Sequence, residues 1–231
     1  MKLASLSTPS LEGWRDRLVA QPFSRRHSRK ILFVLKAILA DAQARGLVAQ
    51  NVPLPVKIDA RKRSEKKLEI GVDIPGKADI QKLLVTLSAP RWRRHRPMLV
   101  CAIFTGMRAS KLRGLAWSAV DFEKNAIAVR QRAGEWGKIG MTKSVNGQRE
   151  IPLSPTLFNT LREWRLACPK SEQDLVFPNT VGKVERLANI AHGVWRPLQK
   201  AGGLVAGEGG PLFNFHALRH FAASLWIELG F

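Results

Sequence analysis

The stretch AIAVRQRAGEWGKIGMTKSVNGQREIPL, residues 126–153, decides the fold class of this 231-residue chain. Apolar and polar residues alternate in its segments AIAVRQR, WGKIGMTKS and QREIPL, and such alternation is typical of strands with one buried face. The dipeptide Asn146-Gly147 is a turn signal between paired strands. We therefore predict a small antiparallel β-sheet between Asn125 and Leu153.

Helical periodicity dominates the sequence on both sides of this region. Apolar spacing of three and four residues predicts helices over 11–20, 24–48, 77–87, 92–105, 109–115, 155–167, 187–201 and 217–229. Gly46 is a helix stop signal, and Ser154-Pro155 supplies a cap and a first-turn proline. The tryptophans fall mostly within these helical patterns and are expected in the core. The expected fold is mainly α with a small antiparallel β-sheet, an α+β class.

A basic segment separates the first two predicted helices from the others. Pro53 and Pro55 precede KIDARKRSEKK, residues 57–67, where apolar periodicity stops and positive charge concentrates. This composition indicates a linker. It is either a solvated tether or a basic strap that lies along DNA phosphates.

The charge balance indicates a polyanionic partner. The chain has 38 Lys and Arg against 18 Asp and Glu, a formal net charge of +20 and a pI near 11.1. Nucleic acid is the favoured partner, because Lys and Arg that bind phosphates release condensed counterions. Non-specific adhesion to RNA or to anionic lipid is the alternative.

Cysteine content and hydropathy bound the compartment. Cys101 and Cys168 are the only cysteines, so neither a disulfide framework nor a cysteine zinc site is indicated. The longest apolar runs, at 31–35 and 98–104, are shorter than the roughly 18 to 20 residues of a membrane span. We expect a soluble, cytoplasmic protein.

Common cofactor motifs are not matched. His216 and His220 lie four residues apart, but Ala217 stands where a zinc hydrolase of the H-E-x-x-H type has glutamate. Lys143-Ser144 is preceded by Thr142 rather than by the glycine of a phosphate-binding loop. We therefore expect no metal and no nucleotide cofactor.

Three stretches in this order resemble the tyrosine recombinases, the phage-integrase family. They are TGMRASKLRGLAW (105–117), MTKSVNGQREIPL (141–153) and HALRH (216–220). The resemblance implies catalytic roles for Arg108, Lys143, His216 and Arg219, with His220 as a supporting residue. Taken alone, Arg108 also fits a helix cap, Lys143 a solvated turn residue and His216 a structural histidine.

These residue types suit the chemistry that the resemblance implies, DNA breakage and rejoining through a 3′-phosphotyrosyl intermediate. Arginines such as Arg108 and Arg219 give phosphate two parallel hydrogen bonds and stay charged. A lysine whose pKa is lowered by nearby cations, here Lys143, is a suitable proton donor for the leaving 5′ oxygen. His216 would assist proton movement or bind the phosphate.

The resemblance also implies a domain organisation and partners. Residues 1–56 would be part of a helical core-binding domain, 57–73 the basic linker and 74–231 the catalytic domain. The expected partner is a double-stranded DNA attachment site, on which full-length family members form tetramers. The residues expected to contact DNA outside the catalytic site are Arg25, Arg26, Arg61, Lys62 and Arg63.

The sequence departs from the family pattern in two places. Lys111 stands where the family usually has glutamate, which adds repulsion near Arg108. The chain contains no tyrosine, and the family's nucleophile lies downstream of the segment that HALRH matches. We therefore expect a chain that lacks its C-terminal end, and part of its N-terminal helical domain. Such a chain would bind DNA without cleaving it and would form a weakened tetramer.

Two other functions stay open at this point. One is a non-catalytic DNA-binding or regulatory remnant of the family, which the missing tyrosine favours. The other is an enzyme similar to type IB topoisomerases, against which the helical N-terminal segment argues.

Overall fold

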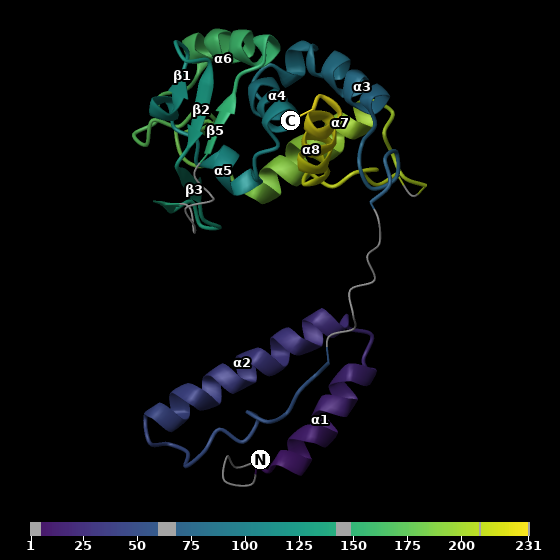
Figure 1. Ribbon diagram of the computed structural model, residues 1–231, viewed down its shortest axis with the longest axis vertical. Helices are drawn as coiled ribbons and strands as arrows, with labels where there is room; N and C mark the ends of the chain where they lie inside the picture. The colour runs from purple at the N-terminus through teal and green to yellow at the C-terminus, as the bar shows by residue number, and fades with distance from the viewer. Residues whose placement is uncertain (1–5, 60–67, 142–148, 208, 231) are drawn as a thin grey trace. The chain divides into compact units, whose positions relative to one another are not determined.

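The computed structural model describes residues 6–59, 68–141, 149–207 and 209–230. The chain divides into two compact units, Met1–Lys67 and Leu68–Phe231. Figure 1 shows both units.

The N-terminal unit contains α1 (Thr8–Ala20) and α2 (Arg25–Ala44). Ser7 and Ser24 cap the two helices with side-chain oxygens that accept backbone N–H groups, which satisfies donors that a helix start otherwise leaves open. A small apolar cluster closes the unit and contains Leu11, Leu32, Val56 and Ile58. Ile58, which the sequence assigned to the linker, is therefore buried in this unit.

The C-terminal unit is built around α4 (Arg96–Thr105), which is apolar on nearly all sides and buries Met98 to Ile103. A helix of this composition needs cover on every face. Helices α3 (Lys77–Leu87), α5 (Ala109–Arg113), α6 (Pro155–Ala167) and α8 (Ala217–Glu228) pack against it, and α7 (Arg196–Ala201) packs against α3 (Figure 1). Short 3-10 turns occupy Pro90–Trp92 and Trp117–Ala119.

The strands form two antiparallel sheets where the sequence predicted one. Strands β1 (Val120–Asp121), β2 (Ala126–Val129) and β5 (Arg149–Pro152) make a sheet in the order β1-β2-β5. Ile127 lies opposite Ile151, and both are buried, as alternation requires. Strands β3 (Gln131–Ala133) and β4 (Ile139–Met141) form a separate hairpin. The expected class, mainly α with small antiparallel β structure, is confirmed, whereas the Asn146-Gly147 turn lies outside the described residues.

Prolines account for two helices that differ from the prediction. The predicted helix over 92–105 begins only at Arg96, because Pro97 suits a first turn but cannot donate within a helix interior. The predicted helix over 187–201 is a π-helix at Asn189–Trp195 followed by α7, and Pro197 lies in the first turn of α7. No helix in the described ranges has the length and apolarity to span a membrane.

Candidate active site

Gly106 joins two of the three motifs. It ends α4 in the left-handed conformation, with φ +57°, a region that glycine adopts without steric cost. A Cβ added at Gly106 would lie 2.9 Å from the Cβ of Ala222, so the absence of a side chain lets α8 approach α4 closely. The guanidinium group of Arg219 donates from Nη1 to the carbonyl oxygen of Gly106 at 2.6 Å. The HALRH and TGMR segments therefore meet, 113 residues apart in the sequence.

Arg108 begins α5 two residues after Gly106. Its backbone is extended, as N-cap residues commonly are, and its carbonyl oxygen accepts the N–H groups of Lys111 and Leu112 at 2.8 and 3.1 Å. The side chain is exposed. Burial, followed by the positive charges of Arg149 and Arg108, lowers the pKa of Arg219. Arg108 and Arg219 are thus close enough to feel each other's charge.

Arg149 is a site residue that the sequence analysis did not single out. It is the first residue of β5 and pairs with Val129 of β2. Together with Arg219 it lines a pocket of about 200 Å³ whose other walls include Thr105, Ala222 and Trp226. The signal was present in the sequence, because Arg149 opens the quoted segment REIPL.

Lys111 completes this group of cations. Its side chain is only 8% exposed. Burial, followed by the charges of Arg149, Arg108 and Arg219, lowers the pKa of Lys111. The direction agrees with the repulsion expected from a lysine at this position. We use the term cation cluster for Arg108, Lys111, Arg149 and Arg219.

His216 and His220 lie beside the cation cluster. His216 is the N-cap of α8, and its ring meets that of His220 edge-on, with 5.1 Å between centroids. Burial, followed by the charges of His220, Arg219 and Arg108, lowers the pKa of His216, so its imidazole is mostly neutral at pH 7. Across the described ranges, no three His, Cys, Asp or Glu side chains gather as a metal site would require.

The loop before α8 is held in place by buried polar side chains. Gln199 of α7 donates to the carbonyl oxygen of Phe213 and accepts its N–H, both at 2.9 Å, and Trp195 donates to the same oxygen at 2.8 Å. Gln199 is fully buried. Asn214 then caps the start of α8 by accepting the N–H of Ala217. This chain of contacts fixes where His216 and Arg219 begin.

Several predicted residues cannot be placed in the site. Lys143, Arg61, Lys62 and Arg63 lie outside the described residues. Arg25 and Arg26 are exposed in the first turn of α2, in the N-terminal unit. Two cations at a helix N-terminus oppose the helix dipole, so their position favours binding over stability.

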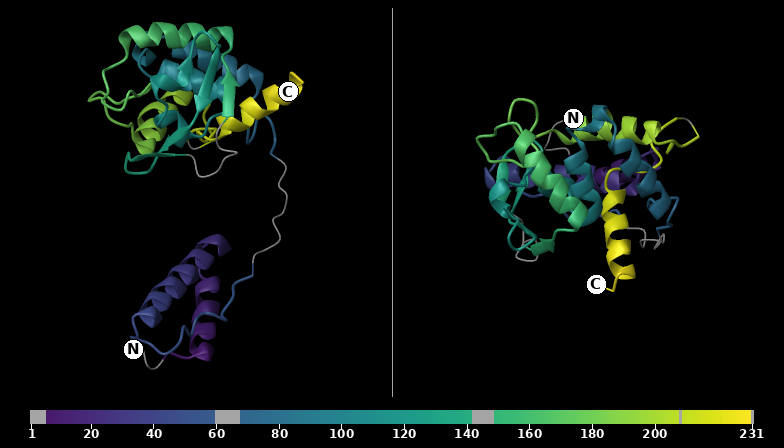
Figure 2. Two further views of the ribbon diagram at one scale, coloured as in Figure 1. Left: turned by 60° about the vertical axis from the view of Figure 1, so that its left-hand side comes forward. Right: turned by 90° about the horizontal axis from the view of Figure 1, so that it is seen from above.

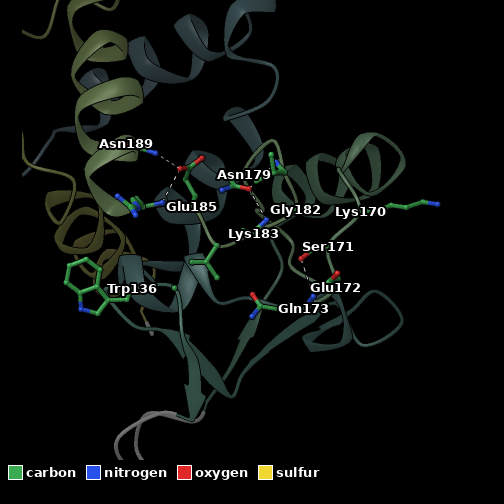
Figure 3. Close-up of a pocket in the computed structure, with 14 residues that line it drawn as sticks. Trp136, Lys170, Ser171, Glu172, Gln173, Asn179, Gly182, Lys183, Glu185 and Asn189 are labelled. Carbon is green, nitrogen blue, oxygen red and sulfur yellow. Dashed lines mark hydrogen bonds between the residues drawn. The ribbon is translucent and has the colours of Figure 1, made fainter.

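A larger polar pocket, of about 840 Å³, lies elsewhere in the C-terminal unit (Figure 3). Trp136 of the β3–β4 turn, Lys170 and Lys183 are among its lining residues. Arg113 of α5 supports one side, because its guanidinium group donates to the carbonyl oxygens of Glu185 and Gly134. Neither Arg108 nor Arg219 lines this pocket, which is thus separate from the cation cluster.

Comparison with known proteins assigns the fold. The model of the phage integrase family matches residues 76–231. A protein of Caldanaerobacter subterraneus subsp. tengcongensis named "Tyrosine recombinase XerC-like" is 23% identical over 254 residues, an alignment that covers 100% of this chain. The chain spans 62% of the length of that relative.

Solved structures with the same fold include three DNA complexes. The Tn1549 transposon integrase bound to a circular intermediate DNA matches with a TM-score of 0.71, at 18% identity over 99% of this chain and 75% of that one. XerH recombinase bound to its palindromic difH substrate gives 0.68, at 18% identity over 99% and 63%. A lambda integrase dimer bound to a COC' core site gives 0.64, at 18% identity over 97% and 75%.

Proposed function

The chain belongs to the phage integrase family, and on that premise we propose that residues 1–231 bind double-stranded DNA at a specific site and hold one backbone phosphate in the cation cluster. The reaction of the whole protein would be site-specific DNA breakage and rejoining through a phosphotyrosyl intermediate. The observation that most supports this is the convergence of Arg108, Arg149 and Arg219 from α5, β5 and α8.

The cluster suits a phosphodiester under attack. Such a phosphorus centre gathers negative charge on its non-bridging oxygens, and fixed cations stabilise that charge. Arg108 and Arg219 would each give the phosphate two parallel hydrogen bonds. One N–H of Arg219 is bonded to Gly106, which orients the group and leaves its other donors for the phosphate.

Proton transfer would involve the remaining motif residues. Lys143 would protonate the leaving 5′ oxygen, the role that the family resemblance assigns to it. His216, which is neutral at pH 7, would accept a proton or a hydrogen bond beside the phosphate. The ring of His220 stands edge-on to that of His216 and would hold its orientation.

The 231 residues contain no tyrosine, and we therefore propose that they bind DNA without cleaving it. A phosphotyrosyl bond needs a phenolic oxygen, and these residues supply none. The same observation favours a second candidate function, a non-catalytic DNA-binding protein that occupies a recombination site. The two candidates differ in whether the natural protein contains a tyrosine beyond this sequence, which the intact mass of the native gene product would determine.

The binding proposal can be tested with duplexes selected from a random library. We expect affinity for the selected site to exceed that for random DNA by about a thousandfold or more, and to fall steeply with salt. Arg108→Ala with Arg219→Ala should remove most of the site preference. Arg162→Ala on α6 is the charge-matched control and should keep it. Equal affinity for selected and random DNA would contradict the proposal.

Cleavage and assembly need separate experiments. On a nicked duplex that carries the selected site, we expect no covalent adduct on denaturing gels, and an adduct would overturn the binding-only proposal. We also propose that the chain self-associates on DNA more weakly than a full tetramer requires. Sedimentation on the selected duplex should then show one or two bound subunits. A stable four-subunit complex would contradict this.

A further inference from the structure

Lys111 occupies an unusual position for a lysine. It lies on α5, a short helix that packs against α4 and β3 (Figures 1 and 2), and its side chain is 8% exposed. Its backbone N–H donates to Arg108, three residues earlier, so both residues project from the same side of α5. Lysines are rarely buried to this extent.

The charges that act on Lys111 come from three elements. They belong to Arg149 at the start of β5, Arg108 at the start of α5 and Arg219 on α8. A buried ammonium group near three guanidinium groups is unfavourable unless an anion enters or the ammonium group gives up its proton. An oxyanion bound among the four groups would offset the repulsion of all of them at once.

The chemistry of position 111 also points to an external anion. A glutamate there, as the family pattern expects, would give the arginines a counter-ion from within the protein. A lysine supplies one more positive charge instead, and the attraction of the cluster for a bound anion increases. The exchange of Glu for Lys thus changes what the position offers to a phosphate.

We propose that Lys111 is a further phosphate-binding residue of this site, and that it binds the oxyanion in its protonated form, so that anion binding above neutral pH takes up a proton. The inference rests on the proposed function in taking phosphate as the ligand. Its sign follows from the neighbouring charges. The arginines favour loss of the Lys111 proton in the free protein, and a bound anion favours its return.

Sulfate is a suitable probe, because it stays a dianion between neutral pH and about pH 10, where lysine titrates. We would follow binding to residues 1–231 by tryptophan fluorescence, at constant ionic strength set with chloride. Wild-type affinity should fall as the pH rises. Lys111→Met should weaken binding about tenfold at neutral pH and abolish the pH dependence. Lys111→Arg should keep the affinity and lose the pH dependence, because arginine stays protonated.

Two further variants keep the outcomes separate. Lys124→Met, at an exposed lysine whose side chain is 78% exposed, has the same charge change and should bind sulfate as the wild type does. If Lys111→Met binds like the wild type with the same pH dependence, Lys111 has only a packing role and the inference is wrong. If Arg108→Ala with Arg219→Ala also binds like the wild type, the cluster is no anion site and the proposed function fails as well.

Discussion

Replacement of Gly106 by alanine tests whether close packing of α4 and α8 assembles the candidate site. Gly106 has φ +57°, and an added Cβ would lie 2.9 Å from the Cβ of Ala222. Left-handed backbone costs a residue with a side chain about 1–2 kcal/mol. Overpacking a close contact costs about 1–3 kcal/mol. We therefore expect Gly106→Ala to lower the free energy of unfolding by about 2–4 kcal/mol.

Gly203→Ala is the matched control within the same unit. Gly203 also has positive φ, +70°, but a Cβ there would meet no atom within 4 Å. It should cost only the backbone strain, about 1–2 kcal/mol. The difference between the two variants isolates the contact with Ala222. Ala222→Gly in the Gly106→Ala background should recover about 1 kcal/mol or more of coupling energy, since it removes the opposing methyl group.

Urea unfolding followed by tryptophan fluorescence measures these differences, since Trp164 and Trp195 are buried in this unit. Gly106→Ala should also weaken sulfate binding, because its carbonyl oxygen positions Arg219. Equal destabilisation by Gly106→Ala and Gly203→Ala, without rescue by Ala222→Gly, would refute the reasoning. The close approach of α8 to α4 would then not determine the geometry of the site.

Three further predictions concern the same unit. Arg219→Lys should weaken binding to the selected duplex about tenfold or more, because lysine lacks the planar fork; fluorescence anisotropy measures this, and unchanged affinity would argue against a bidentate contact. The pKa of His216 is lowered by folding, so its contribution to stability is complete above the ordinary histidine pKa of about 6.5 and is lost as the pH falls through the lower folded value; His216→Asn should flatten that part of the stability profile, and an unchanged profile would contradict the assignment. Gln199→Leu leaves the buried N–H of Phe213 without its acceptor and should cost about 1–3 kcal/mol in urea unfolding, with a loss of sulfate affinity that would be absent if this loop did not position α8.

Helices with strong local signals could be predicted from the sequence. Lys77–Leu87 and Pro155–Ala167 have the predicted bounds. Ser154 caps the second of these, and Pro155 follows it in the first turn, so the start of that helix is written in adjacent residues. The division of the strands into two sheets was not predictable in this way. Alternation marks strands but does not identify their partners, and here the pairing depends on where β3 packs against α5.

The candidate site was predictable only in part, for a similar reason. Arg108, His216 and Arg219 were named from short motifs, whereas their proximity depends on Gly106 and Ala222, two small residues with no chemical role. Lys111 was noticed as a departure from the family pattern, but its burial follows from the packing of α5. No local pattern distinguishes a buried lysine on a five-residue helix from a solvated one.

The way this chain anchors its buried and half-buried arginines bears on its function. Arg219 donates to the carbonyl oxygen of Gly106, Arg113 to those of Glu185 and Gly134, and Arg94 to that of Pro178. A carboxylate would orient a guanidinium group and also neutralise its charge. A carbonyl group orients it and leaves the positive charge in place, at a cost to the stability of the free protein. In a chain of net charge +20, that arrangement keeps the field of these groups available to a polyanion, so that a bound phosphate should stabilise the fold as well as occupy the site.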